Sequence, residues 1–117
     1  MKKIINISLR KNTRLELEAK DIAAFCSDNK YTFFMDDIKT IISNTVFIRE
    51  NKEYLFELDI KNKKCTYLLK PNNLTFDIDV EKISYEARDK EIRLTYKITS
   101  DEEEIELILE EIGEINE

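Results

Sequence analysis

The sequence predicts an all-β domain, a single antiparallel meander of about 8–10 strands that closes into a barrel. The first observation is a period of two: apolar and polar residues alternate along several segments, as they do in strands with one buried face. The second is the spacing of short polar breaks, about every 8 to 12 residues, which is typical of hairpin turns. No break is long enough for the helical crossover that parallel strands need.

The alternation is clearest in three segments, residues 54–60, 74–81 and 91–99. In the second and third segments polar residues occupy every position between the apolar ones, and in the first segment Glu57 and Asp59 do so. The side chains predicted to face the interior are Tyr54, Phe56, Leu58 and Ile60, then Leu74, Phe76, Ile78 and Val80, then Ile92, Leu94, Tyr96 and Ile98.

Two segments, residues 13–26 and 101–115, fit a strand or a helix. Thr13 and Glu16 have the spacing of a helix capping box, and Ser100 and Glu103 repeat it before the second segment. The apolar residues of both segments also fit a helical stripe. In the second segment they alternate as well with glutamates, which is the strand pattern.

The turns must form almost without glycine, because Gly113 is the only one in the chain. Asn and Asp tolerate a positive φ better than other residues, so we expect them at these positions. The 117 residues suit one domain, residues 1–117, with residues 113–117 as a frayed tail.

Charge and composition argue against several classes of partner. The chain has 19 Lys and Arg against 25 Asp and Glu, a formal charge of −6, which is the wrong sign for binding nucleic acid or an anionic membrane. It contains neither a secretory signal nor an apolar run long enough to insert into a membrane, so we expect a cytoplasmic protein. Cys26 and Cys65 are then expected to be reduced core residues.

The residue inventory excludes most catalytic chemistry. With no histidine, Ser-His, Cys-His and His-metal sites are impossible. A single glycine excludes phosphate-binding loops, and no CxxC pair is present. Asp77, Asp79 and Glu81 share one strand face, but their apolar neighbours claim the core, so they are expected to be a solvated face. We therefore expect a protein that is not an enzyme and has neither a metal nor a cofactor.

Four short segments carry a resemblance to a known family: Asp28-Asn29-Lys30-Tyr31 through Asp36-Asp37, Phe47-Ile48-Arg49-Glu50-Asn51, Thr66-Tyr67 with Pro71-Asn72-Asn73-Leu74, and Leu94-Thr95-Tyr96-Lys97-Ile98. Through these segments the chain resembles, over roughly residues 4 to 112, the YwiB-like family of small bacterial proteins, a domain of unknown function with a calycin-like or lipocalin-like barrel. Where the family tends to have glycine, this chain has Asn51 and Asn73. The resemblance implies that residues 13–26 and 101–115 are both strands.

The aromatic residues at inward positions are the remaining candidates for a site. They have two interpretations: ordinary core packing, or tyrosine hydroxyls that converge in a barrel to orient an amphiphilic ligand, as calycin-like proteins do. Arg49 is either a surface charge, if Val46 and Ile48 face inward, or a partner for a ligand carboxylate, if Phe47 does. The inward aromatic set is Tyr54, Phe56, Tyr67, Phe76, Tyr85 and Tyr96.

Two functional hypotheses follow. In the first, a non-enzymatic barrel binds a small apolar or amphiphilic molecule through some of Arg49, Tyr54, Tyr67 and Tyr96. In the second, the protein is an interaction or scaffold module with a solid core, an acidic exterior and a basic protein partner. The sequence specifies neither the ligand nor the partner.

Overall fold

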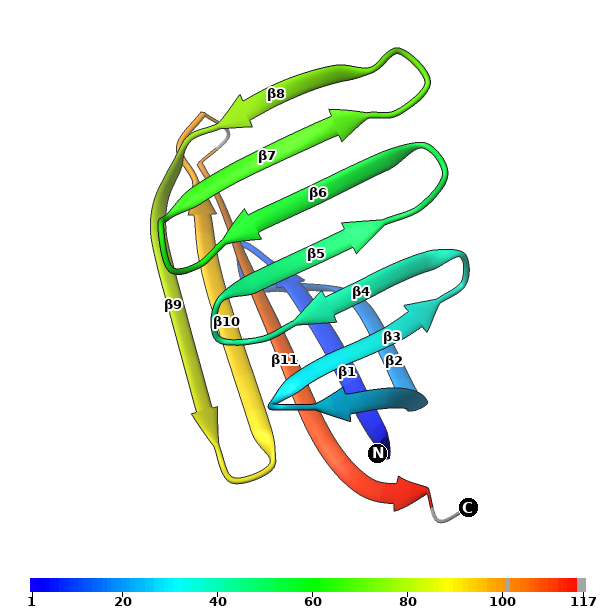
Figure 1. Cartoon of the computed structure of the whole chain (residues 1–117). Helices are drawn as coiled ribbons and strands as arrows, with labels where there is room; N and C mark the ends of the chain where they lie inside the picture. Colours follow the sequence, from blue (N-terminus) through cyan, green and yellow to red (C-terminus); the bar gives the residue numbers. More distant parts are fainter. Residues whose placement is uncertain (101, 116–117) are drawn as a thin grey trace.

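The computed structural model describes residues 1–100 and 102–115, and eleven strands cover most of that range (Figure 1). Each hydrogen-bonded pair of neighbouring strands is antiparallel, and the described residues contain no helix. The all-β antiparallel meander is therefore confirmed. The strands are β1 (Lys2–Lys11), β2 (Arg14–Ser27), β3 (Lys30–Met35), β4 (Ile38–Ile42), β5 (Val46–Glu50), β6 (Tyr54–Asp59), β7 (Lys64–Leu69), β8 (Leu74–Ile78), β9 (Val80–Arg88), β10 (Glu91–Ile98) and β11 (Glu103–Ile115).

The strands form one sheet that curls into a nearly closed barrel. Their order is β8-β7-β6-β5-β4-β3-β2-β1-β11-β10-β9, so β11 lies between β1 and β10, and β8 and β9 form the two edges. The chain passes from β8 to β9 at Asp79, whose carbonyl oxygen accepts a hydrogen bond of 3.0 Å from the Thr99 N–H. A corner of the chain, rather than a ladder of hydrogen bonds, joins the two edges.

The core lies between two layers of this sheet. In Figure 1, β3 to β8 run across the direction of β1, β9, β10 and β11. Alternate side chains of both layers point into the space between them, which is how a curled sheet buries one face. The most deeply buried of these residues are Ile5, Ile7, Ala24, Phe33, Ile42, Phe47, Leu58, Leu94, Leu107 and Leu109.

Both ambiguous segments are strands, β2 and β11. In β2, a bulge near Asp21, where φ is 57°, breaks the alternation. Leu17 and Ala19 are the more buried residues before it, and Ile22 and Ala24 are the more buried ones after it. A bulge adds one residue to one strand and shifts all later side chains by one position. This shift gives a strand the spacing of a helical stripe.

The turns confirm the expected use of Asn and Asp. Asp28 and Asn29, with φ of 53° and 61°, connect β2 to β3 as a two-residue turn, and Asn73 has a φ of 50°. Two positive φ values in succession suit the right-handed twist of a hairpin. The frayed tail does not begin at Gly113, because β11 continues to Ile115. The last two predicted tail residues, 116 and 117, lie outside the described residues.

The inward prediction for Phe76 is wrong. Leu74 and Phe76 of β8 are 49% and 48% exposed. They share a strand face with Ile78, which packs against the core next to the corner at Asp79. β8 is an edge strand, however, and its first residues, farther from this corner, remain uncovered. Asp77 and Glu81 are exposed, as expected of a solvated face.

Candidate functional site

Arg49 lies on the inner face of the barrel. Its neighbour on the same face of β5, Phe47, is fully buried, whereas Val46 and Ile48 are half-buried on the outer face. The register places Arg49 directly opposite Phe56 of β6. Of the two sequence interpretations, the structure therefore supports the one in which Phe47 and Arg49 point inward.

Aromatic rings surround this position. Tyr54 and Tyr67, from β6 and β7, are stacked with ring centroids 5.6 Å apart and an interplanar angle of 14°. Deeper in the barrel, Phe47 contacts Phe56 edge-to-face at 6.1 Å, and the Tyr96 ring lies 6.1 Å from Phe56. Such offset and edge contacts add stability beyond the area that they bury. The deeper rings form a solid floor, and the stacked pair stands above it.

A hollow of about 240 Å³ opens over this floor. All four residues predicted as ligand-binding candidates line it, and Phe56 completes the lining. We call this site the aromatic mouth. Tyr85, another residue of the inward aromatic set, packs against the core elsewhere. The lining residues of the aromatic mouth are Arg49, Tyr54, Phe56, Tyr67 and Tyr96.

Arg49 is the only cation that lines the aromatic mouth. Its Nε atom is buried and has no hydrogen-bond partner within the described part of the chain. Burial raises the pKa of the Tyr96 phenol well above its ordinary value of 10.0, and the charge of Arg49 opposes this rise. The mouth therefore presents a guanidinium next to a neutral phenol.

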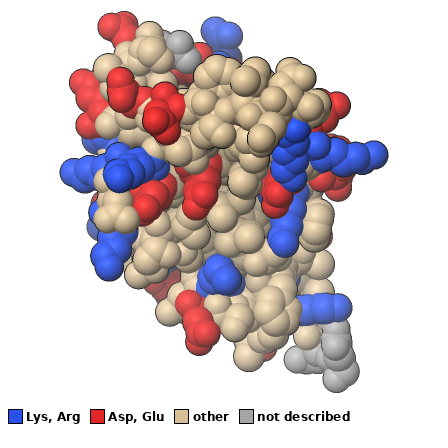
Figure 2. Space-filling model, turned by 45° about the horizontal axis from the view of Figure 1, so that its top comes forward, with Lys and Arg blue, Asp and Glu red and all other residues tan. Residues whose placement is uncertain are grey.

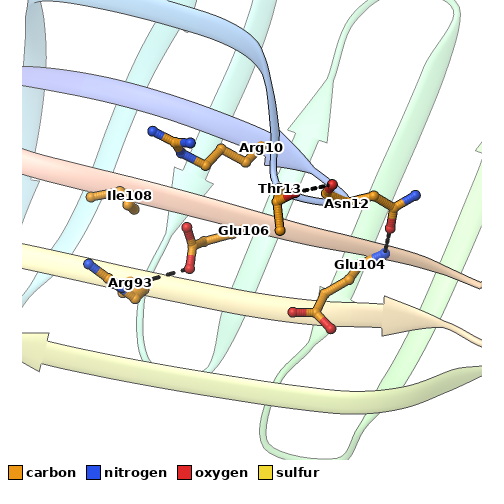
Figure 3. A pocket seen from close by; sticks show the side chains of 7 residues that line it. All are labelled: Arg10, Asn12, Thr13, Arg93, Glu104, Glu106 and Ile108. Carbon is orange, nitrogen blue, oxygen red and sulfur yellow. Dashed lines mark hydrogen bonds and ion pairs between the residues drawn. The ribbon is translucent and has the colours of Figure 1, made fainter.

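A larger depression, about 630 Å³, lies on the outer surface of β1, β10 and β11 (Figure 3). Two of its charges are paired with each other, since Arg93 Nη1 is 3.7 Å from Glu106 Oε2, and the backbone N–H of Glu104 donates to Asn12 Oδ1 at 2.9 Å. The sequence did not indicate it, because three strands distant in sequence form it. Its lining is mostly polar, and we regard it as a hydrated surface rather than a binding site.

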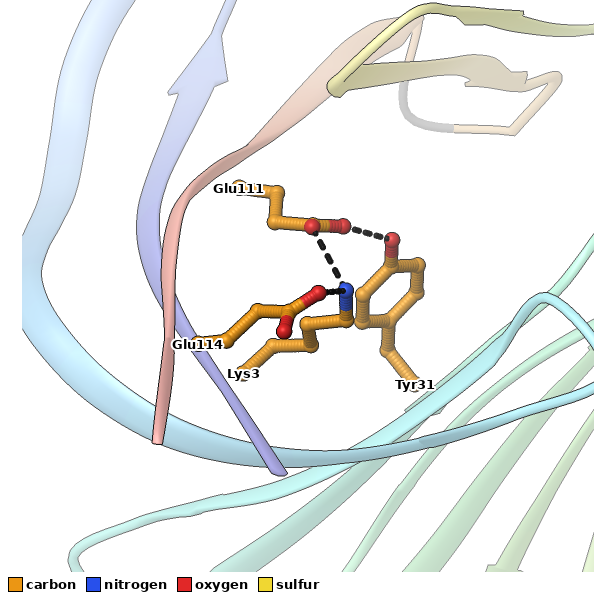
Figure 4. A network of polar contacts seen from close by, with 4 residues as sticks. All are labelled: Lys3, Tyr31, Glu111 and Glu114. Carbon is orange, nitrogen blue, oxygen red and sulfur yellow. Dashed lines mark hydrogen bonds and ion pairs between the residues drawn. The ribbon is translucent and has the colours of Figure 1, made fainter. Parts of the chain in front are cut away.

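A second polar cluster lies inside the barrel, and its members come from β1, β3 and β11 (Figure 4). Lys3 Nζ is 2.6 Å from Glu114 Oε1 and 3.0 Å from Glu111 Oε1, and the Tyr31 hydroxyl donates to Glu111 Oε2 at 2.7 Å. We call these four residues the Lys3 cluster. Sequence reasoning missed it, because it depends on which strands pair with β1.

The contacts of the Lys3 cluster shift the pKa values of Lys3, Glu111 and Tyr31. Hydrogen bonds to Glu114 and Glu111 raise the pKa of Lys3. Burial alone would raise the pKa of Glu111, but hydrogen bonds from Tyr31 and Lys3 outweigh it and lower that pKa. Burial raises the pKa of Tyr31, and its bond to Glu111 adds to this effect.

Comparisons of the chain with protein-family models, curated proteins and solved structures find no match. The resemblance to the YwiB-like family thus stays a prediction from the sequence. The described residues include no helix that is long and apolar enough to cross a membrane.

Proposed function

We propose that this protein is a non-enzymatic barrel protein that binds a small apolar or amphiphilic molecule in the aromatic mouth. The single observation that carries the proposal is the convergence of Arg49, Tyr54, Tyr67 and Tyr96 around one open hollow. Aromatic faces with a few placed polar groups are the usual lining of a small-molecule site. The guanidinium of Arg49 and the phenol of Tyr96, whose pKa burial raises, can bind and orient a ligand, and they exchange few protons near neutral pH.

The size of the hollow limits the ligand. Its volume of about 240 Å³ lies below the roughly 300–1,000 Å³ of most ligand pockets. At about 30 Å³ for each water molecule in the liquid, it has room for about eight waters. Packed rings of Phe47 and Phe56 form the floor beneath it. We therefore expect a one-ring or two-ring molecule rather than a long acyl chain.

The proposed setting is the cytoplasm, without nucleic acid as a partner. Cys26 and Cys65 are both free thiols, and burial raises the pKa of Cys65 to about 11, which makes that thiol unreactive. Figure 2 shows Lys and Arg interspersed with Asp and Glu over one face of the molecule. This mixture and the net charge of −6 support the expectation that the protein does not bind a phosphate backbone.

A titration with 2-naphthol, a neutral two-ring probe, tests the proposal. We expect amide and aromatic NMR signals of the aromatic mouth to shift saturably, and Tyr54→Ala and Tyr67→Ala to weaken binding about 10-fold or more. Phe34→Ala is the matched control, because Phe34 is an exposed aromatic residue outside the mouth. Shifts scattered over the surface, or equal losses with the control, would contradict the proposal.

The second candidate function, an interaction module with a solid core, is favoured by the exposed side of β8. Leu74 and Phe76 lie there on a sheet edge with no strand pairing beyond it in the described chain. A protein partner could add a strand at such an edge. A pull-down at low and high ionic strength, with Phe76→Lys as the comparison, tests this candidate. We expect the native protein to capture a partner at low salt, and we expect both high salt and Phe76→Lys to abolish this binding. An empty pull-down at low salt would exclude the second candidate function.

A further inference from the structure

Two buried side-chain atoms in the described part of the protein lack a hydrogen-bond partner, Thr40 Oγ1 and Arg49 Nε. The two residues face each other directly in the pairing of β4 with β5. Thr40 is 1% exposed, and it also lies opposite Phe33, a core residue on its other side. Directly opposed residues have Cβ atoms about 4.5–5.5 Å apart. Of the two, Arg49 lines the aromatic mouth, whereas Thr40 is buried beside it and does not line the mouth.

This coincidence distinguishes the site from ordinary packing. Folded proteins pair the great majority of their buried polar atoms. A guanidinium that is partly buried without a carboxylate is especially unfavourable, because desolvation weakens the charge and nothing compensates. Tyr96 contributes a neutral phenol to the same mouth. Because Arg49 lines an open hollow, its unpaired guanidinium nitrogen indicates a partner from outside the chain.

The chemistry of Arg49 specifies that partner. Arginine only donates hydrogen bonds, in a planar fork that matches a carboxylate. The single positive charge that lines the mouth requires one negative charge from the ligand. We propose that Arg49 binds the carboxylate of a small aromatic acid whose ring lies against the stacked pair Tyr54 and Tyr67. This proposal rests on the proposed function and defines the class of ligand for the same site.

A matched pair of probes separates charge recognition from general binding. The full chain is titrated with 2-naphthoate and with 2-naphthamide, which has a similar shape but no charge. We expect the carboxylate to bind at least about 10-fold more tightly, the ratio that one charge-assisted hydrogen bond provides. Equal affinities would overturn the carboxylate proposal and leave the proposed function standing. If neither probe binds, both fail.

Two arginine variants test whether Arg49 is the residue that recognises the carboxylate. Arg49→Met is expected to reduce the preference for 2-naphthoate to within about 2-fold, with little loss of 2-naphthamide binding. Arg93→Met removes the same charge from the outer surface, where Arg93 is 46% exposed, and should leave the preference unchanged. If Arg93→Met reduces the preference as much, the long-range field of the protein is responsible and the proposal is wrong.

Thr40→Val keeps the shape of the side chain and removes only a hydroxyl that does not line the mouth. We expect it to leave the preference for 2-naphthoate within about 2-fold of that of the native protein, as a second control. Should Arg49→Met fail to fold by circular dichroism, Arg49→Lys decides the matter, because it keeps the charge and removes the planar fork. We expect Arg49→Lys to lower the preference several-fold, and an unchanged preference in this variant would refute carboxylate recognition by the guanidinium.

Discussion

The two ends of the barrel treat a buried polar group in opposite ways. At one end, Lys3 has two carboxylates within 3.0 Å, and Tyr31 completes the cluster. At the other end, Arg49 has an unpartnered Nε atom, and Thr40 opposite has an unpartnered hydroxyl. A satisfied network holds strands together, whereas unsatisfied groups lower stability until a ligand pairs with them. The Lys3 cluster is therefore a structural polar cluster, whereas the position of Arg49 is a candidate recognition site.

The largest expected effect concerns the packed floor of the aromatic mouth. Phe47 is fully buried and contacts the rings of Phe56 and Tyr96. Phe47→Ala should lower the free energy of unfolding by about 3–5 kcal/mol, because it leaves a cavity in the core. Urea denaturation measures the loss, and Phe34→Ala, an exposed control, should change little. A loss below about 1 kcal/mol would mean that the mouth lacks a rigid floor.

The next prediction concerns the Lys3 cluster, whose polar groups are paired with one another. Tyr31→Phe removes the hydroxyl that donates to Glu111 but keeps the ring. We expect the protein to lose about 1–2 kcal/mol of stability, at the lower end of the range for hydrogen bonds to charged groups, because the cluster is partly hydrated. Tyr54→Phe is the control, since its hydroxyl has no hydrogen bond in the described structure. Equal losses in both variants would remove the distinction between the two ends.

Near Arg49, removal of a hydroxyl is expected to increase the stability of the protein rather than to lower it. Thr40→Val should raise the free energy of unfolding by about 1 kcal/mol, because it removes an unpaired hydroxyl from a site that is 1% exposed. Because Thr40 does not line the aromatic mouth, the same variant should keep its preference for a carboxylate. Denaturation of native, Thr40→Val and Thr40→Ser proteins without ligand gives the comparison. A destabilised Thr40→Val would show that Thr40 is satisfied in solution.

The smallest effect is a dependence on pH. The folded protein holds the pKa of Glu111 below its ordinary value of 4.5, so Glu111 contributes stability above pH 4.5 and loses it as the pH falls through the lowered pKa. Asp59 acts in the same direction, because Asn62 lowers its pKa. Comparing native protein with Glu111→Gln between pH 6 and pH 3 isolates the contribution of Glu111. The free energies of unfolding of the two proteins should converge as the pH falls. A constant difference would contradict the prediction.

Much of the fold was predictable because a strand pattern is local. The alternation in residues 54–60 and 91–99 correctly predicted β6 and β10, and the inward positions of Tyr54 and Tyr96 followed from it. The orientation of Arg49 was not predictable, since apolar residues occupy both faces of β5. In the structure, Ile48 pairs with Ile41 on the outer face and stays half-buried there.

The features that sequence reasoning missed depend on pairing between distant segments. The exposure of Phe76 follows from the position of β8 at an edge, which alternation does not reveal. Lys3 meets Glu111 only because β11 returns to lie against β1. The bulge at Asp21 shifts the inward side chains of β2 by one position, so the spacing of its apolar residues resembles that of a helical stripe.

The position of β11 also has a consequence for how the molecule folds. Lys2 pairs with Ile115, so the contact that joins β1 to the opposite part of the sheet spans nearly the whole chain. Hairpins between consecutive strands, β10–β11 included, can form early, but β1 and β11 remain open edges until they pair with each other. Refolding should therefore be slow for a protein of this size, and its intermediates should be prone to aggregation while those edges are open.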